Sequence, residues 1–461
     1  VNHLENMFGR MGIHISKRAY NQLELFVNSF PGNCYNMDPE YDRFLTLSDA
    51  ATCLMYKEHV QRSEDTPLKI YYTDRKGMPV AIDITGKEGK VKMTDNSNFF
   101  CLGPSGSGKS FHMNSVVRQL HEQGTDVVMV DTGNSYEGLC EYLGGKYISY
   151  TEEKPITMNP FKITKEEINI EKINFLKNLI LQIWKGSEGI VTKTEDRLIG
   201  QAIEEYYRSY FTGKIDAPLS FNSFFDFAVV RIPEIITKNE LKGIDTADLN
   251  YQLRDFYKGG SHETTLNENM DSTLFDETFI VFEIDAIKDD ATLFPIVTLI
   301  IMDVFLQKMR LKKNRKVLVI EEAWKAIATP LMAEYIKYLY KTARKFWASV
   351  GVVTQEIQDI IGSEIVKEAI INNSDVVMLL DQSKFRERFD NIKAILGLTD
   401  VDCKKIFTIN RLDNKEGRSF FREVFIRRGS TSGVYGVEES HECYMTYTTE
   451  RAEKDALKLY K

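Results

Sequence analysis

A glycine-rich segment between an apolar run and a helical pattern is the feature that most constrains the fold of this chain. Residues 99–102 are all apolar, the sequence GPSGSGKS follows at 103–110, and residues 109–123 carry apolar side chains at helical spacing. A second apolar run, 127–130, ends at Asp131. Short apolar runs bounded by turn residues are typical of buried strands, and the order strand, helix, strand is typical of a parallel sheet. The sequence therefore predicts a βαβ unit in this region.

The glycine-rich segment fits the pattern GxxxxGK[ST] of a phosphate-binding loop. Backbone N–H groups can wrap closely around phosphate oxygens only where the chain has few Cβ atoms. The following helix adds the positive end of its dipole, the Lys109 ammonium can reach the β- and γ-phosphates, and the Ser110 hydroxyl can ligate Mg²⁺. The alternative is a Gly/Ser turn that matches the pattern by chance. We predict that a nucleotide is held by eight residues: Gly103, Ser105, Gly106, Ser107, Gly108, Lys109, Ser110 and Phe111.

Two acidic residues follow another strand candidate. Residues 316–320 are predicted to form a buried strand, and Glu321 and Glu322 come directly after it. Carboxylates at a strand end beside a phosphate loop can bind the metal and polarise an attacking water. We assign Glu321, together with Ser110, to Mg²⁺ and Glu322 as the catalytic carboxylate. Alternatively, both glutamates only begin the next helix, where acidic residues favour the helix dipole.

Gln355 and Arg344 flank a further strand candidate at 349–353. Gln355, at the carboxyl end of this strand, can sense the γ-phosphate or orient water. Arg344, at the end of a helical pattern, can reach the nucleotide of a neighbouring subunit. Basic residues at helix ends are also common as simple partners of the helix dipole, so both interpretations stay open.

Further strand candidates lie at 147–149, 279–284 and 375–380, and helical or loop sequence separates them. This alternation predicts an α/β fold with a mostly parallel central sheet and helices on both faces.

Two regions depart from this alternation. Between 163 and 275 the apolar residues recur at helical spacing, which predicts an inserted all-α subdomain. Near the N-terminus, a helix at 17–30 and two short alternating segments at 68–73 and 79–84 predict a β/α flank with a small sheet ahead of the main domain. The predicted division is the flank at 1–96, the first part of the α/β domain at 97–162, the helical insertion at 163–275 and the second part at 276–461.

The composition excludes several classes of protein. With 43% apolar and 27% charged residues in 461, the chain can build packed cores. Its net charge of −8 means that contact with nucleic acid needs a local basic patch. The six cysteines form no CxxC pair and no zinc spacing, which fits a reduced cytosolic compartment. The most apolar helical stretch, 293–305, is too short to span a membrane.

The remaining charged and polar landmarks have simpler interpretations. Arg427 and Arg428 are predicted to be solvated, as are Lys384, Arg386 and Arg388. His112, in the helix after the glycine-rich loop, is predicted to be a packing residue.

The motif segments, in this order, resemble the energising ATPases of conjugation and type IV secretion, of the VirB type and its TraG-type version. More broadly, they are similar to the HerA/FtsK branch of RecA-like motors. The resemblance runs from about residue 98 to the C-terminus. Besides the glycine-rich loop, it includes the segments DTG at 131–133, TMNPF at 157–161, EEAW at 321–324, TQ at 354–355, EGRSFF at 416–421 and YTTE at 447–450.

The resemblance implies a RecA-like P-loop ATPase that uses ATP and Mg²⁺ and assembles into hexamers, although a dimer or monomer stays open for a fragment. It implies that Arg344 is the finger acting in trans, with Arg418 as a second candidate. It also implies inner-membrane secretion-channel proteins as partners and a place in the bacterial cytoplasm at the inner membrane, reached through those partners or a region outside this chain. Because the chain opens with Val1, we expect it to lack an N-terminal part.

Two points stay open after the resemblance. The family usually has Asp-Glu where this chain has Glu321-Glu322, so the extra methylene leaves the Mg²⁺ contact undecided. Three functions compete: a secretion motor, a DNA translocase of the FtsK or coupling-protein kind, and a scaffold that nucleotide stabilises. The negative net charge of the chain disfavours the translocase. Steeply salt-dependent DNA binding would favour it. Nothing in the residues separates ATP from GTP.

Overall fold

The computed structural model describes residues 2–12, 22–33, 37, 40, 46–52, 61–151, 153–186, 189–269, 272–322, 330–355, 370–412 and 417–460. The chain divides into two compact units, 1–60 and 61–461. The first unit contains the short helices α1 (Asn2–Arg10), α2 (Gln22–Asn28) and α3 (Ser48–Thr52). Helix α2 falls within the helix predicted at 17–30, whose residues 17–21 lie outside the described residues.

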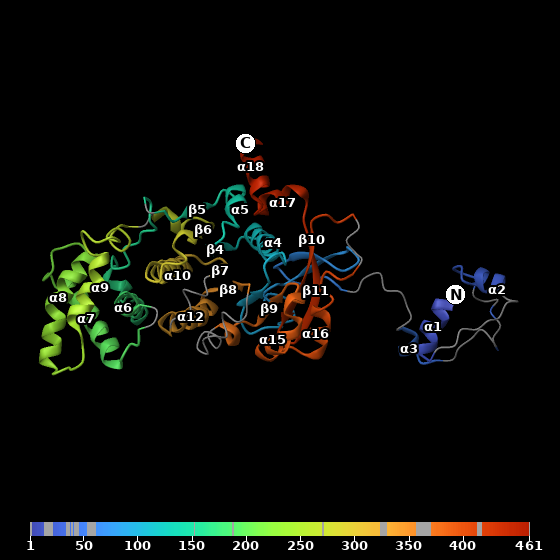
Figure 1. Ribbon diagram of the computed structural model, residues 1–461, viewed down its shortest axis with the longest axis horizontal. Coiled ribbons are helices and arrows are strands. Elements are labelled where there is room, and N and C mark those ends of the chain that lie inside the picture. Colours follow the sequence, from blue (N-terminus) through green and yellow to red (C-terminus); the bar gives the residue numbers. More distant parts are fainter. Residues whose placement is uncertain are drawn as a thin grey trace. The chain divides into compact units, whose positions relative to one another are not determined.

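One eleven-stranded sheet forms the centre of the second unit (Figure 1). Its strands, in chain order, are β1 (Ile70–Thr73), β2 (Pro79–Ile82), β3 (Phe99–Leu102), β4 (Asp126–Asp131), β5 (Lys146–Ser149), β6 (Phe279–Glu283), β7 (Lys316–Glu321), β8 (Ala348–Thr354), β9 (Val376–Leu379), β10 (Phe421–Arg428) and β11 (Thr431–Glu438).

The strand order is β2-β1-β11-β10-β9-β3-β8-β7-β4-β6-β5. The seven strands from β9 to β5 in this order pair in parallel, whereas β2, β1, β11 and β10 add an antiparallel edge next to β9. The predicted α/β fold with a mostly parallel central sheet is confirmed. Every strand predicted from the sequence is present, with ends that differ by one or two residues.

Twelve α-helices of the second unit are described. They are α4 (Lys109–Glu122), α5 (Glu137–Tyr142), α6 (Ile170–Lys185), α7 (Lys193–Phe211), α8 (Phe221–Lys238), α9 (Thr246–Leu253), α10 (Leu293–Leu311), α12 (Pro330–Ala343), α15 (Phe389–Leu396), α16 (Asp400–Ile406), α17 (His441–Tyr447) and α18 (Arg451–Tyr460). Among the described residues, no helix combines the length and the apolar character that crossing a membrane requires.

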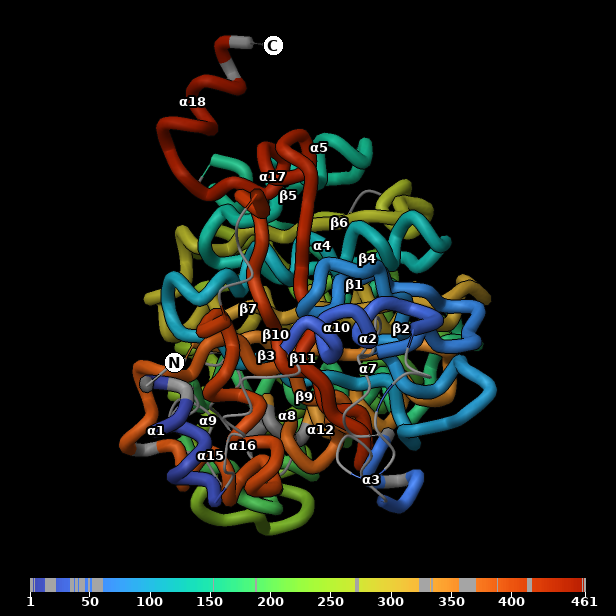
Figure 2. The backbone as a smooth tube through the Cα atoms, turned by 90° about the vertical axis from the view of Figure 1, so that its right-hand side faces the viewer, coloured from blue at the N-terminus to red at the C-terminus, as the bar shows by residue number. Residues whose placement is uncertain are grey.

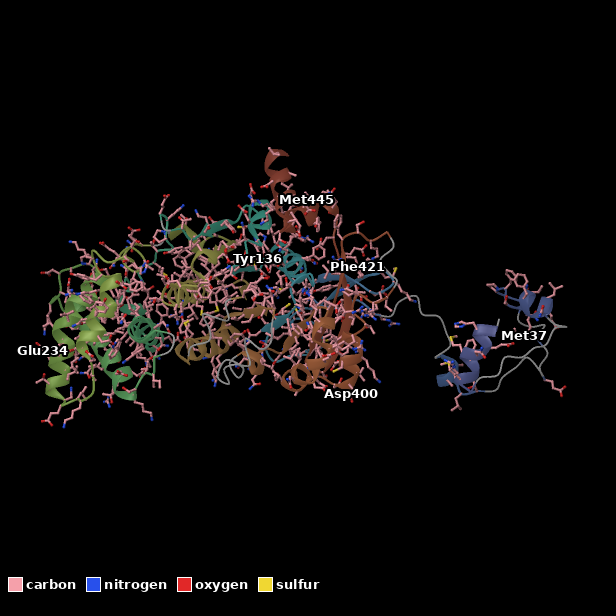
Figure 3. All side chains as sticks on the ribbon, in the orientation of Figure 1. Met37, Tyr136, Glu234, Asp400, Phe421 and Met445 are labelled. Carbon is pink, nitrogen blue, oxygen red and sulfur yellow. The ribbon has the colours of Figure 1, made fainter. Side chains whose placement is uncertain are left out.

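Helices cover both faces of the sheet because successive side chains of a strand point to opposite faces. In β3, Phe100 and Leu102 pack into a core that α6, α10 and α12 share, whereas Phe99 and Cys101 pack into a second core with α4 and α5. Side chains fill the space between these layers (Figure 3), where Tyr136 is fully buried. In Figure 2, α18 extends beyond α17 and away from the sheet.

The predicted small separate sheet at the N-terminal flank is wrong. Strands β1 and β2 do pair with each other, but Thr73 of β1 also pairs with Gly436 of β11, so both strands extend the main sheet. An edge strand has unpaired backbone N–H and C=O groups, and covering the edge of β11 satisfies some of them. The prediction failed because β11 itself was not recognised.

The hairpin β10–β11 has no counterpart in the predictions because charged residues obscure its pattern. Glu423 is buried in β10 and forms an ion pair with Arg75 at 3.2 Å. Arg428 is only 1% exposed, so its predicted solvated position is wrong. Its guanidinium donates hydrogen bonds of 2.8 and 2.6 Å to the two carboxylate oxygens of Glu64. Buried charges are tolerated when they are paired in this way.

The chain between β5 and β6 is helical, as predicted. Helices α6 to α9 lie there, and side chains cap their first turns: Thr192 and Glu195 form a capping box at α7, and Ser220 and Ser223 form one at α8. The division of the chain at 96, 162 and 275 stays a prediction.

Candidate nucleotide site

The predicted phosphate loop connects β3 to α4, and three glycines determine its shape. Gly106 and Gly108 have φ angles of 79° and 93°, which residues with a Cβ rarely adopt. A Cβ on Gly103 would lie 2.7 Å from Ser107 Oγ and 2.8 Å from a methyl carbon of Leu380. The glycine spacing that predicted the loop is therefore a steric requirement of its backbone.

A cavity of about 580 Å³ opens beside this loop. The carboxyl ends of parallel strands meet at one edge of a sheet, and this edge brings residues from distant parts of the sequence into the cavity wall. Asp131 comes from β4, Glu321 and Glu322 from the end of β7, and Gln355 from the end of β8. Six of the eight predicted nucleotide-binding residues line the cavity, whereas Gly103 and Ser107 are not among its lining residues; the six are Ser105, Gly106, Gly108, Lys109, Ser110 and Phe111.

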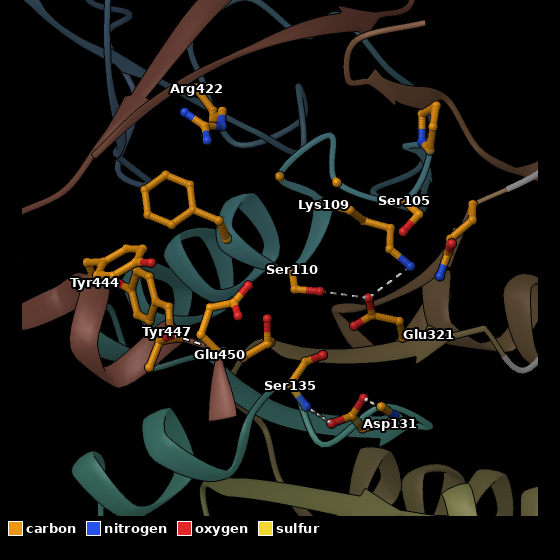
Figure 4. A pocket seen from close by; sticks show the side chains of 18 of the residues that line it. Ser105, Lys109, Ser110, Asp131, Ser135, Glu321, Arg422, Tyr444, Tyr447 and Glu450 are labelled. Atoms are coloured by element: carbon orange, nitrogen blue, oxygen red, sulfur yellow. Dashed lines mark hydrogen bonds and ion pairs between the residues drawn. The ribbon is translucent and has the colours of Figure 1, made fainter. Parts of the chain in front are cut away.

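Lys109 contacts both predicted acidic residues. Its Nζ lies 3.2 Å from Oε1 of Glu321, as Figure 4 shows. The same Nζ forms a short ion pair with Oε1 of Glu322. Burial lowers the pKa of Lys109, but the two carboxylates raise it more, so the ammonium stays charged. The hydroxyl oxygen of Ser110 lies 3.5 Å from Oε1 of Glu321. The structure thus brings the loop and the acidic strand end together, as the sequence predicts.

Glu322 has a left-handed backbone with φ of 54°. Its N–H donates a hydrogen bond of 3.0 Å to the carbonyl oxygen of Val353 in β8, which holds the residue in this conformation. A residue with a Cβ pays about 1–2 kcal/mol for such a backbone. Strain of this kind concentrates at functional sites, and here it directs the Glu322 side chain toward Lys109 rather than along the strand.

Asp131, in the cavity wall, and Glu283 form a buried acidic pair at paired positions of β4 and β6. Burial, followed by the charges of Glu321 and Glu283, raises the pKa of Asp131 well above its usual range. Asp131 accepts hydrogen bonds from the N–H groups of Gly133 and Ser135, and Glu283 accepts one from Asn134. The pair therefore holds the loop after β4 against the cavity.

The far wall of the cavity comes from the C-terminal part of the chain and was not predicted in detail. It contains Ser419–Arg422 at the start of β10, Tyr444 and Tyr447 of α17, and residues 448–450 after this helix. Tyr444, Tyr447 and Glu450 are labelled in Figure 4. The rings of Phe420 and Tyr444 stack with centroids 4.3 Å apart. The motif segments at 416–421 and 447–450 were the only sequence signal for this wall, and residues 413–416 lie outside the described residues.

The predicted residues fit a nucleotide with Mg²⁺. The Oε2 atom of Glu321 and the hydroxyl of Ser107 are buried and have no hydrogen-bond partner within the described part of the chain. A buried carboxylate oxygen of Glu321, with the Ser110 hydroxyl 3.5 Å from the other oxygen of the same carboxylate, is a donor set that suits Mg²⁺.

Arg344 and Arg418 lie away from this cavity. Arg344 is exposed and precedes β8, at the sheet edge opposite the phosphate loop. Arg418 stacks on the Phe421 ring at 3.7 Å and bonds Glu438 and Thr73. Trp324 of the predicted EEAW segment lies outside the described residues.

Two further predictions about single residues can be compared with the structure. His112 is fully buried, its ring nitrogen lies 3.1 Å from the Tyr72 hydroxyl, and burial lowers its pKa to about 3, so it is a packing residue. Lys384 is exposed, but its Nζ also donates a hydrogen bond of 3.0 Å to the carbonyl oxygen of Ser105.

The parallel sheet, the glycine loop at the carboxyl end of β3 and the acidic end of β7 together define a P-loop nucleotide-binding protein of the RecA-like class. Comparison of the sequence with known families agrees with this class. The chain belongs to the TraG P-loop domain family, whose sequence model matches residues 69–461. The predicted resemblance to VirB-type and TraG-type conjugation ATPases is confirmed.

Curated relatives match the chain over about three fifths of its length. It is 24% identical over 298 residues to the protein TraC of Escherichia coli, which is 62% of this chain and 32% of TraC. It is 25% identical over 277 residues to the type IV secretion system protein VirB4 of Bartonella henselae, which is 60% of this chain and 32% of VirB4. The chain thus spans about a third of the length of these relatives.

Solved structures share the fold. VirB4 of Thermoanaerobacter pseudethanolicus superposes with a TM-score of 0.61 at 20% identity, covering 83% of this chain and all of that one. The bacterial conjugative coupling protein TrwB superposes with a TM-score of 0.50 at 13% identity, covering 80% of this chain and 88% of that one.

Proposed function

We propose that this chain is the motor portion of an ATPase that energises a conjugative or type IV secretion apparatus. The observation that carries the proposal is the contact between the phosphate loop and the acidic strand end, in which Lys109 and Ser110 face Glu321 and Glu322. The family and its relatives TraC and VirB4 supply the biological setting.

Each residue of the contact has a separate role in this proposal. The loop N–H groups and Lys109 bind the phosphates, and Ser110 and Glu321 hold Mg²⁺. When bound, the metal neutralises charge on the phosphate oxygens and polarises the γ-phosphate. Glu322 orients the attacking water and accepts its proton, and Gln355, at the adjacent strand end, reports the state of the γ-phosphate.

Nucleotide binding must release Lys109 from its present partners. The ammonium exchanges its contact with Glu322 for the phosphate oxygens, and this exchange leaves the Glu322 carboxylate free to accept a proton. As long as Lys109 pairs with Glu322, this carboxylate cannot accept a proton from water, so hydrolysis requires that phosphate competes for Lys109.

Arg344 acts in trans in this proposal, within a hexamer. Strand β8 separates Arg344 from its own phosphate loop by about 20 Å, since seven residues rise about 3.3 Å each, so it cannot reach its own nucleotide. Arg344 is exposed and has no ion-pair partner among the described residues, so it is available to a neighbouring subunit. Arg418 remains the second candidate, although it must first leave Glu438.

Steady-state ATP turnover by the oligomer tests the proposed chemistry. Lys109→Ala and Glu322→Gln should each abolish turnover, and Glu322→Gln should still bind nucleotide. Glu122→Gln is the matched control, because this carboxylate lies at the far end of α4, where it pairs with Arg118. Turnover near the wild-type rate in both site variants would disprove the proposed ATPase.

Subunit mixing tests the finger in trans. An arginine finger contributes about 10³–10⁵ in rate, so Arg344→Ala should abolish turnover and spare nucleotide binding, whereas Lys345→Ala should retain turnover. Mixing Arg344→Ala subunits with Glu322→Gln subunits should restore part of the activity, because some interfaces then contain one intact site. If no mixing ratio restores activity, Arg344 does not act across an interface.

The proposed setting is the cytoplasmic side of the bacterial inner membrane, in contact with secretion-channel proteins. The fold shared with TrwB keeps a DNA translocase as the second candidate. Turnover that rises with added DNA and falls steeply with salt would favour the translocase, whereas turnover indifferent to DNA would favour the secretion motor.

A further inference from the structure

We propose that Arg422 is a phosphate-binding residue that the chain supplies to its own nucleotide. This inference rests on the proposed nucleotide site and adds a cation from a part of the chain that no motif assigns. Arg422 lines the same cavity as Lys109 and Ser110, and Figure 4 shows it at the start of α4, on the opposite side of the loop from Glu321.

The sheet topology delivers Arg422 to the phosphate-binding edge. Strand β10 runs antiparallel to β9, so its first residues lie where the parallel strands end. The pairing of β10 with β9 ends at Phe425 opposite Leu379, and Arg422 lies three residues beyond it, past the end of β9. Only a strand that runs in this reversed direction can begin beside the phosphate loop.

The alternation of β10 directs the Arg422 side chain to the face that carries α4. Val424 and Ile426 pack in the core that also contains Met113 and Val116 of α4. Residues two apart in a strand share a face, so Arg422 lies on this face as well. The start of β10 therefore lies next to the start of α4, and the N-terminus of a helix is where phosphate binds.

Arg422 also contacts the loop directly. Its Cγ lies 3.0 Å from the position that a Cβ of Gly108 would occupy, and its Cδ lies 3.5 Å away. The aliphatic part of Arg422 therefore packs over Gly108 and directs the guanidinium into the cavity. Two features therefore require glycine at position 108: its φ of 93° and the close approach of the Arg422 side chain.

The guanidinium has capacity left for a ligand. Its NH1 group donates a hydrogen bond of 2.8 Å to the carbonyl oxygen of Phe421, and no ion pair involves Arg422 within the described part of the chain. A guanidinium has five N–H donors, in a geometry that suits phosphate oxygens. By contrast, Arg418 on the preceding turn is engaged with Glu438, and Lys109 is engaged with two carboxylates.

The charge balance of the cavity favours such a cation. Lys109 carries one positive charge against the two carboxylates of Glu321 and Glu322, so the phosphate end of the cavity is net negative before any ligand binds. A triphosphate adds several more negative charges, of which Mg²⁺ neutralises two. Arg422 supplies a positive charge that forms no ion pair with an acidic residue among the described residues.

Titration with a fluorescent ADP tests the inference by binding alone, without turnover. Arg422→Ala should weaken ADP binding about tenfold or more, since hydrogen bonds to charged groups contribute this much, and Arg422→Lys should fall between. Arg451→Ala is the matched control, because this arginine is 96% exposed, follows Glu450 and removes the same charge outside the cavity. Adenosine, which has no phosphate, should bind to the wild-type protein and to Arg422→Ala equally. The two proteins should also unfold at the same temperature.

The outcomes separate this inference from the proposed function. If Lys109→Ala loses ADP and Arg422→Ala binds it as wild type does, the nucleotide site stands and the role of Arg422 is refuted. If Arg451→Ala weakens binding as much as Arg422→Ala, the effect is long-range charge and the direct contact is refuted. If wild type binds no nucleotide with Mg²⁺ present, the proposed function itself fails.

Discussion

The contact between Lys109 and Glu322 predicts that replacing the catalytic carboxylate tightens nucleotide binding. In the structure, Lys109 is only 8% exposed and is held by Glu321 and Glu322 together. Phosphate must compete with these carboxylates for the same ammonium. Glu322→Gln removes one competing charge and keeps the shape and hydrogen-bonding capacity of the side chain.

The size of the effect follows from the kind of bond that is lost. Two unit charges about 3 Å apart interact by about 5 kcal/mol at an effective dielectric constant near 20, which is an upper bound. A glutamine amide still accepts a hydrogen bond from the charged Lys109 ammonium, so only the charge of the acceptor is lost, which we take as about 1–1.5 kcal/mol. ADP should therefore bind Glu322→Gln about 5–10 times more tightly than wild type.

The assay is titration with ADP and with a non-hydrolysable ATP analogue, so that blocked hydrolysis cannot imitate tight binding. Glu450→Gln is the comparison, since Glu450 lines the same cavity without an ion pair to Lys109. If Glu450→Gln tightens binding equally, the effect is general repulsion rather than release of Lys109. If Glu322→Gln binds ADP as tightly as the wild-type protein or more weakly, Glu322 does not compete with phosphate for Lys109.

Three further predictions concern the loop, the sheet edge and the buried acids. Gly103→Ala should weaken nucleotide binding at least about tenfold in the same titration, because its Cβ would collide with two side chains, whereas Gly144→Ala, with open space around it, should bind normally and cost about 1 kcal/mol of stability. Glu64→Gln should lower the unfolding free energy by about 3 kcal/mol in urea titration, because it leaves the Arg428 guanidinium buried without a counter-charge; an unchanged midpoint would contradict this. Burial raises the pKa of Asp131, so its contribution to stability is complete below the ordinary value of 3.8 and is lost as pH rises through the folded pKa. Urea unfolding at a series of pH values above 3.8 should therefore show a decline in wild type that is smaller in Asp131→Asn, and parallel declines would argue against it.

The phosphate site was predictable from sequence because its parts are local. The strand, the glycine loop and the helix are consecutive, so backbone conformation and side-chain periodicity specify them without help from the rest of the chain. Glu321 and Glu322 were recognisable for the same reason, since they directly follow a continuous apolar strand. Their meeting with Lys109 followed from one general property, that parallel strands end at the same edge.

The hairpin β10–β11 was not predictable by the same means. Its strands contain Glu423 and Arg428, and in sequence such residues suggest a solvated surface. They are buried because Arg75 and Glu64, each more than 300 residues away, neutralise them. A pattern within one segment cannot reveal a partner that the fold supplies from another.

The amino-acid sequence by itself determined the class of fold, the phosphate loop and the acidic residues opposite it, because short-range sterics and hydrophobic periodicity specify them. Tertiary structure alone decided that β1 and β2 extend the main sheet, that Arg428 is buried, and that Arg422, near the start of a reversed strand, lies beside Gly108. These outcomes depend on which distant strands pair, and pairing is a choice among long-range contacts that no local pattern encodes.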